Sequence, residues 1–283
     1  MQTESKKTVE ITCGNRKLSL NRPLVMGIIN FTPDSFYSQS RAVTDIQIAE
    51  KTEKMISEGV DIIDAGAYSS RPEADDVSVE EEISRLTRGL QIMKQAAPDI
   101  PVSIDTFRAK AVECLFDRFG HFIVNDISAG ELDDRMFDTV ARLSLPYIAM
   151  HMKGKPQTMQ NHSVYDNLME EIIAYFVNKI KRLRNAGIND IIIDPGFGFA
   201  KTVEQNYNLL NNLSDFKNFE LPLLVGFSRK SMLYKLLNTT PEGSLNATTV
   251  ANTVALMNGA DILRVHDVRA AVEAVEIIEK LKN

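Results

Sequence analysis

Polar side chains stand at the ends of several apolar segments in this 283-residue sequence. The clearest is segment 191–202, where three consecutive isoleucines run into Asp194 and a glycine-rich turn that carries Lys201. Consecutive β-branched residues are typical of a strand buried on both faces, and Pro195 with the glycine after it ends that strand abruptly. The pattern therefore predicts a carboxylate at the end of a buried strand, where it can accept hydrogen bonds from a ligand.

The same arrangement recurs along the chain with different polar groups. Side chains two apart in a strand share a face, so placing each strand-end residue inward turns Ile29, Ile104 and Val265 toward a layer of helices. By the same parity Asn125 faces inward and Asp126 outward. The inward-facing set combines acceptors, donors and cations where the strands end, a region called the mouth below. Its members are Asn30, Asp64, Asp105, Asn125, Met150, Asp194, Arg264 and His266.

Two groups of charges suggest what this mouth binds. The turn 228–231 carries Arg229 and Lys230, and with Arg264 and His266 it matches the region where barrels often hold phosphate groups. A solvated charge pair ahead of a helix is the competing interpretation of the turn alone.

Carboxylates beside a lysine suggest recognition of a planar heterocycle. Asp105 and Asp194 can accept from amidine-like N–H groups, while Lys230 donates to a ring oxygen or nitrogen. Taken singly, Asp105 and Asp267 could instead be helix N-caps, and we favour the cap for Asp267.

The elements that must position these residues alternate regularly along the chain. Capping patterns start helices at Thr44, with Gln47, and at Ser78, with Glu81. Strands are predicted at 24–30, 61–64, 101–105, 121–125, 145–150, 190–194, 221–226 and 261–266. Helices are predicted at 44–59, 78–97, 108–119, 133–143, 164–186, 202–212, 245–258 and 268–281.

Eight strand–helix units without a linker or composition break predict one α/β domain over 1–283, a single (β/α)8 TIM barrel. Residues 1–20 form an N-terminal extension with a β-hairpin turning at Gly14-Asn15. An open doubly wound sheet is disfavoured, because the Gly-x-Gly-x-x-Gly pattern expected after its first strand is missing.

Composition narrows the functional classes. Apolar content of 44%, charged content of 25% and a net charge of −6 are those of a globular protein and argue against nucleic-acid binding. Cys13 and Cys114 lack metal-ligand or redox spacing and indicate reduced thiols. The sequence has no signal core and no membrane-length apolar run, so we expect a cytoplasmic protein with no membrane partner.

Read together, the motifs resemble those of the dihydropteroate synthases, a family of pterin-binding enzymes. The resemblance spans about residues 22–280 and keeps the family's order of motifs. The matching segments are Met26 to Phe36, Asp64 to Pro72, Ser103 to Thr106, Asn125 to Ser128, Met150 to Met152, Asp194 to Phe199, Gly226 to Ser231 and Arg264 to Asp267.

The resemblance implies a transferase that condenses p-aminobenzoate with 6-hydroxymethyl-7,8-dihydropterin diphosphate, giving 7,8-dihydropteroate and diphosphate in folate biosynthesis. It implies catalytic roles for Asp105, Lys230, Arg264 and His266. The residues implied to bind the pterin are Asp64, Asp105, Asn125, Met150, Asp194 and Lys230.

The resemblance also implies a Mg²⁺-bound diphosphate and a target of sulfonamides, which occupy the p-aminobenzoate site in this family. Asn30 is implied to serve the metal, and Asn30, Arg71, Arg264 and His266 the diphosphate. The residues implied to line the p-aminobenzoate site are Ser70, Arg71, Pro72, Phe199, Lys230 and Ser231. Loops carrying Asp34 and Phe36, and Ser70 and Arg71, are implied to close over the substrates, and the family is usually homodimeric through its last helices.

Several positions depart from the family pattern, namely Tyr68, Ser70, Glu73, Ala200 and the loop 37–41. Three alternatives stay open on the sequence: a non-catalytic pterin-binding paralogue, a corrinoid-dependent pterin methyltransferase, and a Schiff-base aldolase acting through Lys230.

Overall fold

Eight parallel strands form a nearly closed barrel in this computed structural model, which describes residues 9–32, 41–68, 77–154 and 163–282. Neighbouring strands pair in chain order, and β10 returns to pair with β3. A parallel bridge between Ile193 and Leu223 joins the two remaining edges. The strands are β3 (Leu24–Asn30), β4 (Ile62–Gly66), β5 (Val102–Asp105), β6 (Ile123–Asp126), β7 (Tyr147–Met150), β8 (Ile191–Asp194), β9 (Leu224–Val225) and β10 (Ile262–Val265).

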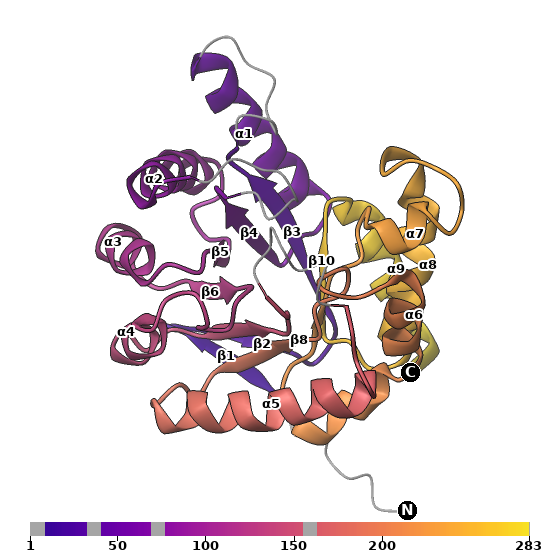
Figure 1. Cartoon of the computed structure of the whole chain (residues 1–283). Helices are drawn as coiled ribbons and strands as arrows, with labels where there is room; N and C mark the ends of the chain where they lie inside the picture. The colour runs from indigo at the N-terminus through magenta and orange to yellow at the C-terminus, as the bar shows by residue number, and fades with distance from the viewer. Residues whose placement is uncertain (1–8, 33–40, 69–76, 155–162, 283) are drawn as a thin grey trace, which may run out of the picture.

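Helices surround the strands, as Figure 1 shows, which confirms the TIM barrel predicted from the alternating elements. The α-helices are α1 (Arg41–Ser57), α2 (Val79–Ala96), α3 (Ala109–Phe119), α4 (Met136–Arg142), α5 (Leu168–Asn185), α6 (Val203–Asn211), α7 (Ser231–Tyr234), α8 (Leu245–Met257) and α9 (Val268–Lys282). Two 3₁₀ segments, η3 (Leu213–Phe219) and η4 (Glu242–Ser244), follow α6 and precede α8.

Several predicted boundaries were wrong by a few residues, including the starts of α4 and α5, which begin at Met136 and Leu168 and not at 133 and 164. Helix α1 begins at Arg41, so Thr44 lies inside the helix and does not open it. Strand β9 keeps only two residues of the predicted 221–226, and Leu223 pairs through an isolated bridge. By contrast, the Ser78 side chain accepts from the Glu81 amide at 3.2 Å, which confirms that start of α2.

The strands separate two apolar layers, as the alternation of their side chains requires. An inner cluster fills the barrel, and an outer cluster, which includes Ile29, Ile104 and Val265, packs under the helices. The inner cluster consists of Ile11, Leu24, Met26, Ile62, Ile123, Ile148, Ile192, Leu224 and Ile262.

The N-terminal hairpin closes the end of the barrel opposite the polar mouth. Strands β1 (Glu10–Cys13) and β2 (Arg16–Ser19) pair antiparallel, and buried Ile11 joins the inner cluster. The Thr12 amide donates to Asp190 at 2.9 Å, which ties the hairpin to the residue that leads into β8. The predicted hairpin is confirmed.

Cys13 and Cys114 are both unpaired in the structure. Searching the described part of the chain finds no helix that combines the length and the apolar character needed to cross a membrane. The cytoplasmic location and the division of 1–283 into one domain stay predictions.

Candidate functional site

An arginine and two carboxylates meet where the strands end. The Arg264 guanidinium, on β10, donates through Nε to Asp64 at 2.7 Å and through Nη2 to Asp105 at 2.7 Å. Asn125, on β6, donates its side-chain amide to both Asp64 oxygens at 3.3 and 3.2 Å. Four predicted site residues from four strands therefore form one connected network, and the inward placement of Asn125 is confirmed. Asp126 faces the other way and accepts from Tyr147 Oη at 2.6 Å.

Burial and mutual attraction set the charges of this network. Burial raises the pKa of Asp105 to about 7, against the lowering effect of Arg264, and Asp64 adds like-charge repulsion. Burial alone would lower the pKa of Arg264, but the two carboxylates outweigh it and raise that pKa. Two carboxyl groups thus share one guanidinium, so the trio carries no surplus positive charge.

Asp194 differs from these two carboxylates because no Lys or Arg nitrogen of the described residues lies within the ion-pair distance of 4.0 Å. Its Oδ1 accepts from the Gly196 amide at 2.8 Å. Burial raises its pKa, with Lys230 opposing at longer range. Asp194 is therefore a buried acceptor at the mouth that a donor on a ligand can satisfy.

The turn after β8 must be glycine at position 196. Gly196 has φ of 72°, and a Cβ there would lie 2.0 Å from the carbonyl oxygen of His151. The same position would be 3.4 Å from Cγ of Met150, which is buried beside the turn. The glycine thus brings the Asp194 turn directly against the end of β7.

Lys230 crosses over this turn from the next loop. Its Nζ donates to the Phe197 carbonyl at 2.5 Å and lies 4.7 Å from the centre of the Phe199 ring. Burial lowers its pKa to about 8. Phe197 is a core residue whose ring centre lies 4.4 Å from that of Phe227, with the two rings tilted by 56°. Phe199 is half-buried, so of these two rings Phe199 is the one that can face a ligand.

His266 and Asn30 lie at the ends of the adjacent strands. The His266 amide donates to Ser228 Oγ at 3.2 Å. Burial, together with the positive charges of Arg264, Lys51 and Arg229, lowers the pKa of its ring to about 3, so the ring is neutral at pH 7. Asn30 Oδ1 lies 3.0 Å from the point where a Cβ on Gly66 would be, so the glycine leaves room for the carboxamide.

The turn 228–231 divides its two cations. Arg229 donates through Nε and Nη2 to Asp267 at 3.2 and 2.8 Å, away from the Lys230 contacts. Asp267 directly precedes α9, as expected of an N-cap residue, but its carboxylate binds this guanidinium. Ser231 begins α7 next to Lys230.

Several predicted site residues lie outside the described ranges: Asp34, Phe36, Ser70, Arg71 and Pro72. Their roles stay predictions. Among the residues that depart from the family pattern, Tyr68 packs edge-on against Phe107 at 5.0 Å between ring centres. Ala200, which also departs from the pattern that the resemblance implies, has φ of 49°, a left-handed conformation that costs a non-glycine residue about 1 kcal/mol.

Sequence reasoning assigned no role to Lys201, which is buried behind the turn. Its Nζ contacts the Gly196 carbonyl at 2.9 Å, the Phe199 carbonyl at 3.1 Å and His151 Nδ1 at 3.1 Å. Burial lowers the pKa of Lys201 to about 7 and that of His151 well below its ordinary value. The available signal was the turn itself, because buried carbonyls in a glycine-rich turn require donors.

Comparison of this chain with known proteins identifies the family to which it is similar. Residues 26–266 match the family described as "Pterin binding enzyme". The dihydropteroate synthase of Escherichia coli K12 is 40% identical over 264 residues, which cover 93% of each chain. That of Haemophilus influenzae is 35% identical over 277 residues, covering 97% of this chain and 100% of the relative.

Solved structures that are similar to this chain come from the same family. Yersinia pestis dihydropteroate synthase in a sulfonamide drug complex is 39% identical with a TM-score of 0.89, over 97% of this chain and 99% of that one. Xanthomonas albilineans dihydropteroate synthase with 4-aminobenzoic acid is 33% identical with a TM-score of 0.90, over 98% and 99%.

The buried Lys201 predicts an unusual pH dependence of stability. Its pKa falls from 10.5 in the unfolded chain to about 7 in the fold, so between these values the unfolded state holds a proton that the folded state lacks. Stability conferred by Lys201 should therefore rise with pH, by at most about 1.4 kcal/mol per pH unit. In urea unfolding at pH 7, 8 and 9, the free energy of unfolding of the wild type should increase relative to that of Lys201→Met as the pH rises.

The exposed Lys181 of α5 provides a matched control, since Lys181→Met introduces the same side chain at the surface. A constant difference between wild type and Lys201→Met across this pH range would contradict the burial of an uncharged lysine.

Proposed function

Since the chain belongs to the dihydropteroate synthases of the pterin-binding enzyme family, we propose that its mouth joins p-aminobenzoate to 6-hydroxymethyl-7,8-dihydropterin diphosphate, giving 7,8-dihydropteroate and diphosphate. The observation that carries this assignment is a buried Asp194 without an ion pair, at the same end of the barrel as the network of Asp64, Asp105, Asn125 and Arg264. A pterin presents several N–H donors on one edge, and these acceptors suit it.

The pterin ring is proposed to lie among Asp105, Asn125, Asp194 and Lys230, with Met150 beneath it. Asp194 accepts from the ring's N–H groups, which removes the cost of leaving a buried carboxylate unsatisfied. Asp64 supports the ring indirectly, because it fixes both Asn125 and Arg264. Lys230 exchanges its bond to the Phe197 carbonyl for a polar atom of the ring.

The diphosphate is proposed to lie against Asn30, Arg264, His266 and Arg71. Among the residues in the described ranges, no group of three His, Cys, Asp or Glu side chains could hold a metal ion. The lone carboxamide of Asn30 nevertheless fits Mg²⁺, which keeps several waters and takes most of its other ligands from phosphates. Asn30 would hold the ion at this edge, and bound Mg²⁺ would neutralise charge on the leaving diphosphate.

The p-aminobenzoate ring is proposed to bind against Phe199, Lys230 and Ser231, together with Ser70, Arg71 and Pro72 from the loop after β4. The Lys230 ammonium already lies over the face of the Phe199 ring. This arrangement can hold an aromatic acid from one side. Asp34 and Phe36 are proposed to close over the bound substrates.

In the reaction, the aromatic amine attacks the methylene carbon, a C–N bond forms and the C–O bond to diphosphate breaks. The amine then releases a proton. Because this amine is a weak nucleophile, the protein must mainly stabilise the departing diphosphate and the positive charge left on carbon. Asp105 lies where it can stabilise that developing positive charge, and His266 with Arg264 receives the diphosphate.

The direct test of this function is diphosphate release from the pterin diphosphate. Release and dihydropteroate formation should both require p-aminobenzoate and Mg²⁺.

In Asp194→Asn the loss of a charged acceptor should weaken pterin binding roughly 100-fold by calorimetry. Pterin binding without p-aminobenzoate-dependent release would instead indicate a non-catalytic paralogue, and unchanged affinity in Asp194→Asn would remove Asp194 from the site.

The diphosphate assignment makes a separate prediction for His266→Ala. We expect this variant to raise KM for the pterin diphosphate about tenfold, because one polar contact to the diphosphate is lost. The affinity for the pterin that lacks diphosphate should change less than twofold. An equal loss of affinity for both ligands would contradict the assignment of His266 to the diphosphate. Arg264→Ala is a poorer test, since leaving Asp64 and Asp105 unpaired should destabilise the fold by about 3 to 5 kcal/mol.

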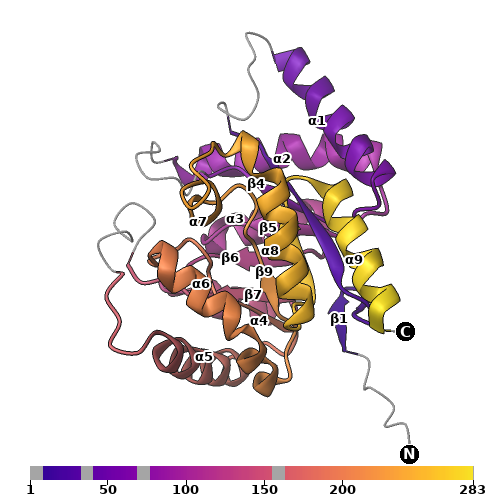
Figure 2. The same ribbon diagram turned by 90° about the vertical axis from the view of Figure 1, so that its right-hand side faces the viewer.

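We also propose a homodimer through α8 and α9, which lie side by side in Figure 2. Their outer faces expose Val250, Val254 and Met257, and Ile277 and Leu281, by 37% to 75%. Helical stripes of this kind favour burial against a partner. Sedimentation should give a dimer for the wild type, a monomer for Met257→Asp, and a dimer for the control Ile46→Asp on α1. A monomeric wild type would exclude this interface.

A further inference from the structure

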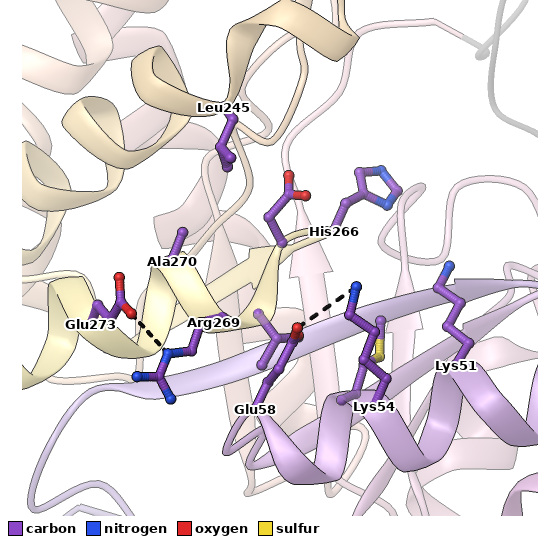
Figure 3. Close-up of a pocket in the computed structure, with 11 residues that line it drawn as sticks. Lys51, Lys54, Glu58, Leu245, His266, Arg269, Ala270 and Glu273 are labelled. Carbon is purple, nitrogen blue, oxygen red and sulfur yellow. Dashed lines mark hydrogen bonds and ion pairs between the residues drawn. The ribbon is translucent and has the colours of Figure 1, made fainter.

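A cavity of about 320 Å³ lies beside the proposed diphosphate site, between α1 and the start of α9. This volume is at the lower end of the range for small-molecule sites, about 300 to 1,000 Å³. Its lining includes Lys51 and Lys54 from α1, and Arg269 from α9. His266 also lines it, so the cavity adjoins the mouth of the barrel (Figure 3).

Most of the cations in and around this cavity are already neutralised. Lys54 pairs with Glu58 at 3.8 Å, and Arg269 pairs with Glu273 at 2.8 Å. Lys51 is the exception, because no carboxylate of the described residues lies within 4.0 Å of its ammonium.

The environment of Lys51 is short of negative charge. Burial lowers its pKa, and Arg229 lowers it further, while Asp267 is the acidic group that opposes them. Asp267, however, is already held by the Arg229 guanidinium at 2.8 Å. An additional anion in this cavity would therefore meet an uncompensated positive charge.

Lys51 is close enough to His266 to affect it. In Figure 3 the Lys51 ammonium extends from α1 on the same side of the cavity as the imidazole. Lys51 is also one of three cations that lower the pKa of His266, with Arg264 and Arg229 as the others. Of these three, Arg264 and Arg229 are each held by carboxylates, so only Lys51 keeps its charge free.

We propose that Lys51 is a further binding residue for the diphosphate, reaching it from α1 across the cavity that adjoins His266. This inference rests on the proposed placement of the diphosphate at His266 and Arg264. A diphosphate carries several negative charges, and the trio of Arg264, Asp64 and Asp105 supplies no surplus positive charge to meet them. A free ammonium can form a charge-assisted hydrogen bond to a phosphate oxygen.

The test uses Lys51→Met, which removes the charge and keeps an apolar stem. Burial disfavours the ammonium at this site, so the variant is expected to fold. Lys54→Met is the matched control, since Lys54 lies one turn further along α1, lines the same cavity and is paired with Glu58.

The readouts are KM for the pterin diphosphate and the inhibition constant of inorganic diphosphate, both with Mg²⁺. Lys51→Met should raise each about tenfold. KM for p-aminobenzoate and the Kd of pterin without diphosphate should stay within twofold, as should all four values in Lys54→Met. Lys51→Arg should recover most of the loss.

An unchanged inhibition constant in Lys51→Met, with His266→Ala still impaired, would overturn the role of Lys51 alone. Equal losses in Lys51→Met and Lys54→Met would also overturn it, because they would indicate a general field and no specific contact. If neither Lys51→Met nor His266→Ala altered diphosphate inhibition, the proposed placement of the diphosphate itself would fail.

Discussion

The sharing of one guanidinium by two buried carboxylates is the constraint on which the mouth depends. Arg264 comes from the last strand of the barrel, while Asp64 and Asp105 come from β4 and β5, 200 and 159 residues away in sequence. Asn125 extends the network to β6 through Asp64. Removing Arg264 would leave both carboxylates buried without a cationic partner, a cost of several kcal/mol. These contacts therefore fix the strand ends relative to one another and determine which polar groups remain for substrates.

This arrangement divides the mouth electrostatically. On one side Asp194 is an acceptor without an ion pair, which favours a ligand rich in N–H groups. On the other side Arg264 is saturated by carboxylates and Arg229 by Asp267, so cations that look available in the sequence are already committed. Because the charge of Arg264 is balanced by these carboxylates, we propose that a polyanionic leaving group needs further partners besides Arg264, namely His266 as a neutral donor, a metal ion at Asn30 and any cation left unpaired. Lys51, which has no carboxylate of the described residues within 4.0 Å, is the cation that we propose for this role.

Much of this site could be predicted because a closed barrel leaves few choices. Once β-branched runs end in polar residues, the period of two sends Asn30, Asp64, Asp105, Asn125 and Asp194 inward together. The pairing among them could not be predicted, because it depends on side-chain reach across the barrel: Arg264 was expected to face a ligand and it also binds Asp64 and Asp105. Lys201 and Lys51 were missed for the same reason, since their contacts are set by the packing of a turn and of α1. The start of α1 was misplaced because the capping pattern at Thr44 recurs inside an ongoing helix.

The turn after β8 shows how the fold limits the cost of binding. Lys201 holds the Gly196 and Phe199 carbonyls from behind, and Lys230 holds the Phe197 carbonyl from the mouth. Only the second of these lysines is in position to exchange its carbonyl for a ligand atom, because Lys201 is buried. In the proposed complex, Asp194 and Phe199 would therefore keep their positions while Lys230 changes partners. Groups that are fixed before the substrate arrives need no reorganisation during the reaction, and this preorganisation is what makes buried charges effective against a developing cation and a departing anion.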